Sequence, residues 1–311
     1  LGFIQSTGQI QNNQIVWGWG GYSILNESKD DLQYLGIKKS IKEARDLGAD
    51  VCISFGGLSG TPFWQTTQDV NILYNTYLDV VKGYGLTRID LDVEGPAQNK
   101  QNNIANAKAI KKLQDTTGVD VSLTLPVLPS GLIHEGLGVL EAYLSEGVDL
   151  VNVNIMTMCY GSGTLLPGEN YGTASLRAVD SLKDQLIDYY KRFANTTLSN
   201  EQAYAKIGTT VSIGFEGYSH PIFTTQWSKL VVDHAIEKKI GMTSFWSLNR
   251  DAQLENNQGV NSQYEFTNIF KNFGSTSSTP IDPVEPVDPV ENAKPKISGA
   301  TNKTIYVDEN F

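Results

Sequence analysis

The sequence predicts an α/β protein, and within that class a (β/α)8 TIM-type barrel. From residue 1 to residue 273, short runs rich in β-branched and aromatic residues alternate with longer segments whose apolar residues recur at steps of three and four. Strands and helices in alternation select a parallel architecture. The barrel is favoured over an open doubly wound sheet, because no G-x-G-x-x-G or Walker sequence follows any predicted strand.

Each predicted strand is a short β-type run, and most predicted helices end at glycine, the usual helix stop. The strands occupy residues 1–5, 50–57, 88–95, 120–127, 150–158, 206–214 and 242–248. The helices occupy residues 37–48, 69–85, 102–118, 137–147, 174–193 and 225–241. This is one strand short of eight. Because the chain opens at "LGFIQ", without an initiator Met and inside a strand pattern, we expect the first barrel strand to be missing from it.

Composition changes sharply at Gly274. Residues 274–296 carry proline every few positions with acidic residues between, which predicts an extended, semi-rigid linker. Residues 297–311 return to β-type alternation and resemble the start of a truncated immunoglobulin-like domain, too short to build a core. We therefore expect three parts: a catalytic barrel over 1–273, the linker, and the β tail. A modular, secreted protein fits this layout.

Charge and composition exclude several classes of partner. The formal net charge is −10 and the pI is near 4.8, so no dense Lys/Arg surface for nucleic acid or anionic membrane is expected. No window approaches the roughly 18 apolar residues of a membrane span. Cys52 and Cys159 lie in apolar strand-like runs and are predicted to be small buried hydrophobes rather than a disulfide or metal site. The histidines have no metal-ligand spacing, which argues against a zinc hydrolase.

The segment "TRIDLDVEGP" carries the strongest chemical signal. Asp90, Asp92 and Glu94 stand at every second position, so in a strand they share one face. In a barrel that face lines the axis, and Gly95-Pro96 would end the strand with Glu94 at its active-site tip. Crowded buried carboxyls raise one another's pKa, and a protonated Glu is a general acid. Two alternatives stay open: an antiparallel strand with its acids in water, and a divalent-cation cluster.

Asp-x-Asp-x-Glu at a strand end resembles the signature of the family 18 glycoside hydrolases, the chitinases and their relatives. "SFGG" (54–57) and "WSLNRD" (246–251) are similar to other strand ends of that family, and "TLPVLPSGL" (124–132) and "NIMTMCYG" (154–161) resemble a secreted microbial branch. The likeness spans nearly all of residues 1–273.

The resemblance implies a retaining, substrate-assisted mechanism without metal, cofactor or protein nucleophile. Glu94 would protonate the glycosidic oxygen while the sugar's own 2-acetamido group attacks the anomeric carbon. Asp92 would orient that group and stabilise its growing positive charge, and Asp90 would tune Asp92 through a shared proton.

The resemblance also implies a set of substrate-binding residues. Trp246 would form the floor under the sugar and Tyr160 would hold the acetamido group; the remaining members are Met158, Cys159, Glu216 and Gly57. Three more tryptophans, Trp17, Trp19 and Trp64, are candidate stacking platforms, with an ordinary place in the core as the alternative.

The sequence departs from the family pattern at three places. Thr87-Arg88 stand where the signature begins with Asp-Gly, outside the chemistry. Cys159 occupies the position of a substrate-binding aspartate, and Glu216-Gly217 replaces Asn-Asp. A thiol is a poor acceptor for a sugar hydroxyl. We hypothesise that Glu216 supplies the acid lost at Cys159, if the two strand ends face each other.

The function predicted is an endo-acting chitinase that cleaves β-1,4 bonds between N-acetylglucosamine units. The protein is expected to be a monomer whose partner is chitin or another N-acetylglucosamine-containing glycan. Three alternatives remain: an endo-β-N-acetylglucosaminidase acting on N-glycans, a weakly active or non-catalytic chitin-binding barrel, and a metal-dependent carboxylate enzyme.

Overall fold

The structure is a computed structural model, and it describes residues 1–22, 32–252 and 259–274. The predicted β tail, and the predicted linker beyond Gly274, lie outside the described residues. Among the helices described, none combines the length and the apolar character that a membrane crossing requires.

The described strands form one eight-stranded sheet in the order β2-β1-β3-β4-β5-β6-β7-β8. Their bounds are β1 Gly2–Gln11, β2 Gln14–Trp19, β3 Ile53–Gly56, β4 Arg88–Asp92, β5 Asp120–Pro126, β6 Leu150–Met156, β7 Ile207–Ser212 and β8 Met242–Trp246. β1 and β3 to β8 pair in parallel, whereas β2 pairs antiparallel with β1. The predicted α/β class with a parallel central sheet is confirmed.

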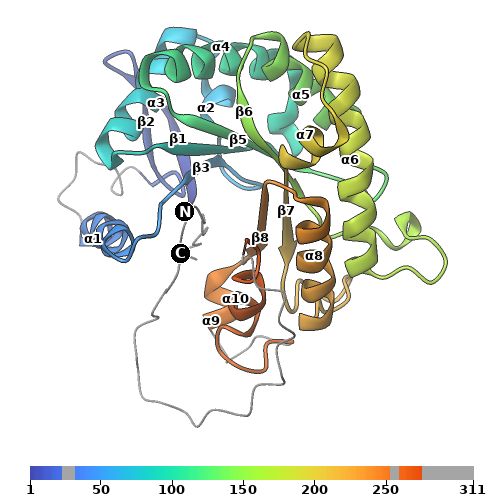
Figure 1. Cartoon of the computed structure of the whole chain (residues 1–311). Helices are drawn as coiled ribbons and strands as arrows, with labels where there is room; N and C mark the ends of the chain where they lie inside the picture. Colours follow the sequence, from blue (N-terminus) through green and yellow to red (C-terminus); the bar gives the residue numbers. More distant parts are fainter. Residues whose placement is uncertain (23–31, 253–258, 275–311) are drawn as a thin grey trace.

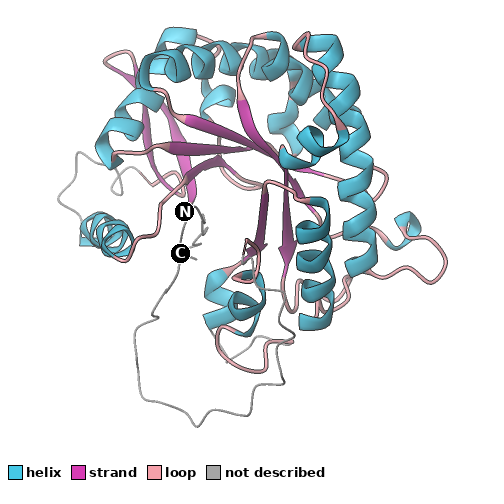
Figure 2. Cartoon of the chain, viewed as in Figure 1, coloured by secondary structure: helices cyan, strands magenta, loops and turns pink. Residues whose placement is uncertain are grey.

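Helices α1 to α8 connect successive parallel strands and lie outside them, whereas α9 and α10 follow the last strand, β8 (Figures 1 and 2). Their bounds are α1 Leu32–Asp46, α2 Phe63–Thr66, α3 Val70–Tyr84, α4 Lys100–Thr117, α5 His134–Ser145, α6 Tyr171–Phe193, α7 Asn200–Ala205, α8 Thr225–Lys238, α9 Leu248–Ala252 and α10 Glu265–Phe270, with short 3-10 turns η2 Gly95–Gln98 and η3 Ser162–Thr164. Local signals set several ends: Asp69 caps α3 through its side chain, and Gly85 and Gly118 close α3 and α4 in the left-handed conformation.

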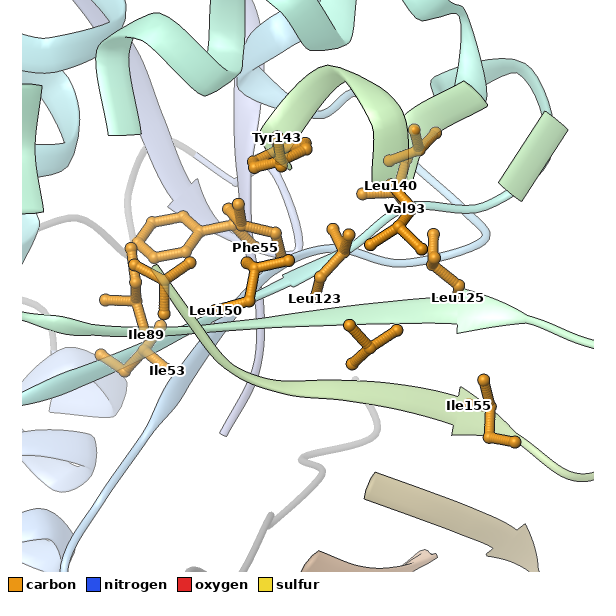
Figure 3. Packing of buried hydrophobic residues seen from close by; sticks show 14 of the residues in the cluster. Ile53, Phe55, Ile89, Val93, Leu123, Leu125, Leu140, Tyr143, Leu150 and Ile155 are labelled. Atoms are coloured by element: carbon orange, nitrogen blue, oxygen red, sulfur yellow. The ribbon is translucent and has the colours of Figure 1, made fainter. Parts of the chain in front are cut away.

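The core lies between the outward faces of the strands and the surrounding helices. Ile89, Leu91 and Val93 are fully buried, as alternation along β4 predicts. Figure 3 shows Val93 beside Leu125 and Leu140, where the ends of β4 and β5 meet α5. The apolar face of β4 is thereby held under helices, which leaves its other face for the acidic side chains.

The first strand, β1, is longer than predicted, and the chain then turns back to form β2 beside it. Asn12 and Asn13 both have positive φ, at 50° and 58°, which suits a tight hairpin turn between β1 and β2. Asparagine is one of the few residues that tolerates this conformation. The predicted strand at 1–5 is therefore only the inner part of a hairpin, and "NN" was the signal for it.

The two ends of the parallel series meet through side chains. Among the described residues, no main-chain pairing joins β8 to β1. The rings of Phe3 on β1 and Trp246 on β8 stack instead, with centroids 5.9 Å apart and planes inclined by 20°. The sheet has the strand order of a barrel, and an aromatic contact bridges its open side.

Candidate active site

The acidic residues lie on the inner face at the C-terminal end of β4. Asp90 and Asp92 are only 2 % and 5 % exposed, and Glu94, half-buried, follows the strand immediately before η2. β4 lies between β3 and β5 and pairs in parallel with both. The alternative of an antiparallel strand with its acids in water is therefore wrong.

Close packing of β3 against β4 depends on glycine. Gly56 has φ +112°, and a Cβ atom there would lie 2.1 Å from the carbonyl oxygen of Asp92. At the next residue, Gly57 donates its amide to that same oxygen at 3.1 Å. The "GG" of "SFGG" thus fixes where the backbone of Asp92 lies.

Asp90 is a fully satisfied carboxyl group. The hydroxyl of Ser54 donates to Oδ2 at 2.7 Å, and those of Ser122 and Thr124 each donate to Oδ1 at 2.8 Å. Burial raises the pKa of Asp90, and the three hydroxyls oppose that rise because they stabilise the charged form.

Asp92, unlike Asp90, has a carboxyl oxygen without a hydrogen bond. Its Oδ1 is buried and has no hydrogen-bond partner. Burial raises the pKa of Asp92 well above its ordinary value, and the neighbouring charges of Glu94 and Asp90 raise it further. Burial also raises the pKa of Glu94. Both shifts favour a proton on the Asp92–Glu94 pair, beside an acceptor oxygen that lacks a donor.

Across the site, Glu216 is held by an arginine that the sequence reasoning missed. Arg250 of α9 donates through Nη1 to Glu216 Oε2, and it also donates to the Ser212 hydroxyl at 2.6 Å. Ser212 in turn donates to Glu216. The signal for Arg250 was its place in "WSLNRD", just past β8.

Cys159 shares this electrostatic neighbourhood. Its side chain is exposed whereas Cys52 is buried, so the prediction of a small buried hydrophobe is right for Cys52 and wrong for Cys159. Desolvation by the surrounding protein raises the pKa of the Cys159 thiol to about 11, the charges of Glu216 and Glu94 act in the same direction, and Arg250 opposes them. The structure therefore brings Cys159, Glu216 and Glu94 into one group at the ends of three different strands. This geometry is the condition under which Glu216 was expected to compensate for Cys159.

Phe3, near the start of β1, lies against Trp246 at the end of β8 and against Gly57, which follows β3. Trp246 is half-buried, and Phe3 stacks on it. A Cβ atom on Gly57 would lie 2.8 Å from the Phe3 ring, so glycine is required there. Phe3 was not foreseen as part of this cluster.

The other sequence-predicted residues lie further into the protein. Tyr160 is 2 % exposed, its ring packs edge-on against Tyr171, and its hydroxyl has no hydrogen-bond partner. Met158 is half-buried. The three tryptophans considered as stacking platforms are all buried: Trp17, Trp19 and Trp64. Their core alternative holds, with Trp64 donating to the Ala97 carbonyl at 2.9 Å.

The acidic residues of β4 were also considered as a divalent-cation cluster. Within residues 1–22, 32–252 and 259–274, no group of three or more His, Cys, Asp or Glu side chains is placed to hold a metal ion. The lone pairs of Asp90 already accept from hydroxyl groups.

A parallel α/β barrel-type sheet with buried carboxyls at the C-terminal end of β4 has the layout in which (β/α)8 enzymes carry their active sites. No family model matches the chain. It is 32 % identical over 242 residues to a probable bifunctional chitinase/lysozyme of Escherichia coli K12, covering 74 % of this chain and 26 % of that protein. It is 33 % identical over 222 residues to endochitinase 11 of Metarhizium anisopliae, covering 68 % of this chain and 42 % of that protein.

Solved structures give the same fold. The catalytic domain of a hyperthermophilic chitinase from Pyrococcus furiosus matches with a TM-score of 0.73 and 24 % identity, over 90 % of this chain and 87 % of that chain. A GH18 chitinase from Pseudoalteromonas aurantia matches with a TM-score of 0.50 and 18 % identity, over 87 % and 90 %. The chain is thus similar in sequence to two curated chitinases and in fold to solved chitinases, one of them of family GH18. It spans 26 % and 42 % of the two curated relatives.

Proposed function

We propose that the protein hydrolyses β-1,4 bonds in chitin or N-acetylglucosamine oligomers by a retaining, substrate-assisted mechanism. One observation carries the proposal: Asp92 keeps a buried, unpartnered carboxyl oxygen beside the half-buried Glu94. An acetamido N–H is a donor of the kind that this oxygen lacks. The chitinases among the relatives support the substrate class.

In the first step, Glu94 donates its proton to the glycosidic oxygen and the bond from that oxygen to the anomeric carbon breaks. The acetamido carbonyl oxygen forms a new bond to the same carbon, which gives an oxazolinium ion. Asp92 accepts the acetamido N–H and carries the compensating negative charge, because the proton that the Asp92–Glu94 pair shares is the one on Glu94 in this step.

In the second step, water attacks the anomeric carbon and Glu94 takes the proton from that water. The ring oxygen of the oxazolinium leaves, and the acetamido group is regenerated. Two displacements at one carbon retain the β configuration. Trp246 supplies a flat apolar face for the sugar ring throughout.

Endo-acting cleavage, a monomeric state and secretion belong to the same proposal. The name of the Metarhizium relative, an endochitinase, supports internal cleavage. The Pro-rich pattern after Gly274 supports a modular protein that works on an extended polymer outside the cell.

The test is a digest of chitin oligomers with products separated by size and by anomer. The wild-type protein should release β-anomeric products, and Glu94→Gln should lower turnover about 10²- to 10⁴-fold, the usual contribution of a general acid. Glu135→Gln is the matched control, because Glu135 is an exposed carboxylate in the first turn of α5. Products of α configuration, or a fully active Glu94→Gln protein, would overturn the mechanism. An N-glycan substrate run in parallel tests the endo-β-N-acetylglucosaminidase alternative.

A further inference from the structure

A row of polar side chains, all buried except the half-buried Thr210, crosses the interior from β8 to β4 and ends on Asp90. It contains one residue from each of β5, β6, β7 and β8. The Thr124 hydroxyl donates to Asp90 Oδ1 at 2.8 Å, and Asn154 Nδ2 donates to Thr124 Oγ1 at 3.0 Å. Thr210 Oγ1 donates to Asn154 Oδ1 at 3.0 Å and lies 2.6 Å from the hydroxyl of Ser244.

Every hydrogen bond in the row points the same way. The single hydroxyl hydrogen of Thr210 is used on Asn154, so Ser244 must be the donor in the 2.6 Å contact. Asn154 then accepts on one side and donates on the other. The dipoles of the row therefore add, with the positive end of each directed at Asp90, and hydrogen bonds in a chain strengthen one another.

We propose that Asn154, Thr210 and Ser244 are positioning residues that hold Asp90 in its anionic form and so direct the shared proton of the site to Asp92 and Glu94. The inference depends on the proposed function for its catalytic meaning, although the ionisation of Asp90 can be measured without any substrate. It assigns a purpose to polar residues in a region where a barrel usually packs Val, Ile and Leu.

The surroundings of Asp90 suit this role. β3 and β5 present only hydroxyl groups to its oxygens, those of Ser54, Ser122 and Thr124. The charged groups that act on it come from its own strand. Arg88 favours the anion, whereas Asp92 repels it. The uncharged row adds stabilisation of the anion without adding another titrating group.

The experiment follows carboxyl ¹³C NMR signals of Asp90, Asp92 and Glu94 through a pH titration in a matched pair of variants. Thr210→Val removes a donor from the row, whereas Thr209→Val removes a hydroxyl that bonds Thr157 on the other face of β7. Both positions are adjacent on one strand and the substitution is the same. Any general effect of losing a threonine hydroxyl in β7 should therefore appear in both proteins.

Thr210→Val should raise the pKa of Asp90 by roughly 0.3 unit, the size expected when one cooperative bond is lost from a chain ending on a charge. Thr124→Val should raise it by about one unit or more, because the direct donor is lost. Thr209→Val should leave it unchanged. Ser244→Ala provides a second remote variant should Thr210→Val not fold.

The acidic limb of the kcat/KM profile should move to higher pH most in Thr124→Val, less in Thr210→Val and not in Thr209→Val. The reason is that an Asp90 with a raised pKa becomes protonated at a higher pH. Equal shifts in Thr210→Val and Thr209→Val, or no shift in Thr124→Val, would overturn the proposal. A protein whose Asp90 titration responds as expected but which cleaves no chitin would refute the proposed function and leave the row's effect on Asp90 intact.

Discussion

Replacing Asp92 by Asn should abolish turnover and yet stabilise the fold at neutral pH. The Asp92 carboxyl is 5 % exposed, one of its oxygens has no partner, and it lies between the carboxyls of Asp90 and Glu94. An unsatisfied buried polar group costs about 1–3 kcal/mol. An uncharged amide removes the repulsion and can donate to either neighbour, so we expect a gain of about 1–3 kcal/mol at pH 7, which corresponds to about 2–4 °C in Tm per kcal/mol.

The effect has a defined pH dependence. The folded-state pKa of Asp92 is raised above the ordinary value of 3.8, so its contribution to stability is fully present below pH 3.8 and is lost as the pH rises through the folded-state pKa. The stability advantage of the Asn variant should therefore grow as the pH rises above 3.8 and level off above the folded-state pKa of Asp92. Thermal unfolding followed by circular dichroism between pH 3 and pH 8 measures this directly.

Asp120→Asn serves as the control, because Asp120 is exposed at the start of β5 and its replacement should leave the Tm unchanged. An Asp92→Asn protein that is less stable than wild type at pH 7 would refute the reasoning. A stability gain that stays constant across the pH range would show that the carboxyl's ionisation is not its cause.

Further predictions concern the rest of the site. Gly56→Ala should destabilise the fold by about 3 kcal/mol in urea unfolding, since its Cβ would meet the Asp92 carbonyl at positive φ, whereas Gly138→Ala, within α5, should not. Glu216→Gln should weaken oligomer affinity or turnover several-fold, and unchanged kinetics would contradict a compensating role for Glu216. Tyr218 follows β7 and is 96 % exposed, so Tyr218→Ala should leave the Tm unchanged. The same variant should pellet less with insoluble chitin, because an exposed ring can stack on a sugar. Equal pelleting of variant and wild type would exclude a contact between Tyr218 and chitin.

The parallel strands and the inward face of β4 could be predicted because local pattern determines them. Alternation along Ile89 to Val93 specifies which side is buried, and Gly95-Pro96 marks the strand end. Contacts between distant segments were less accessible. Arg250 meets Glu216 only because α9 folds back across the end of β7, and Trp17 is buried because the β1–β2 hairpin packs on α3. The motif around Arg250 was visible in the sequence, but its pairing with Glu216 was not, because both contacts depend on how distant segments fold together.

The aromatic bridge between Phe3 and Trp246 has a consequence for motion. Elsewhere neighbouring strands are tied by main-chain ladders, but here two stacked rings meet across the seam, so parting β1 from β8 breaks no ladder bond in the described chain. Local opening of the sheet should therefore occur mainly between β1 and β8, where its free-energy cost is lowest. A sugar bound on Trp246 would also steady Phe3, which stacks on it. Substrate binding would therefore reduce the motion between β1 and β8.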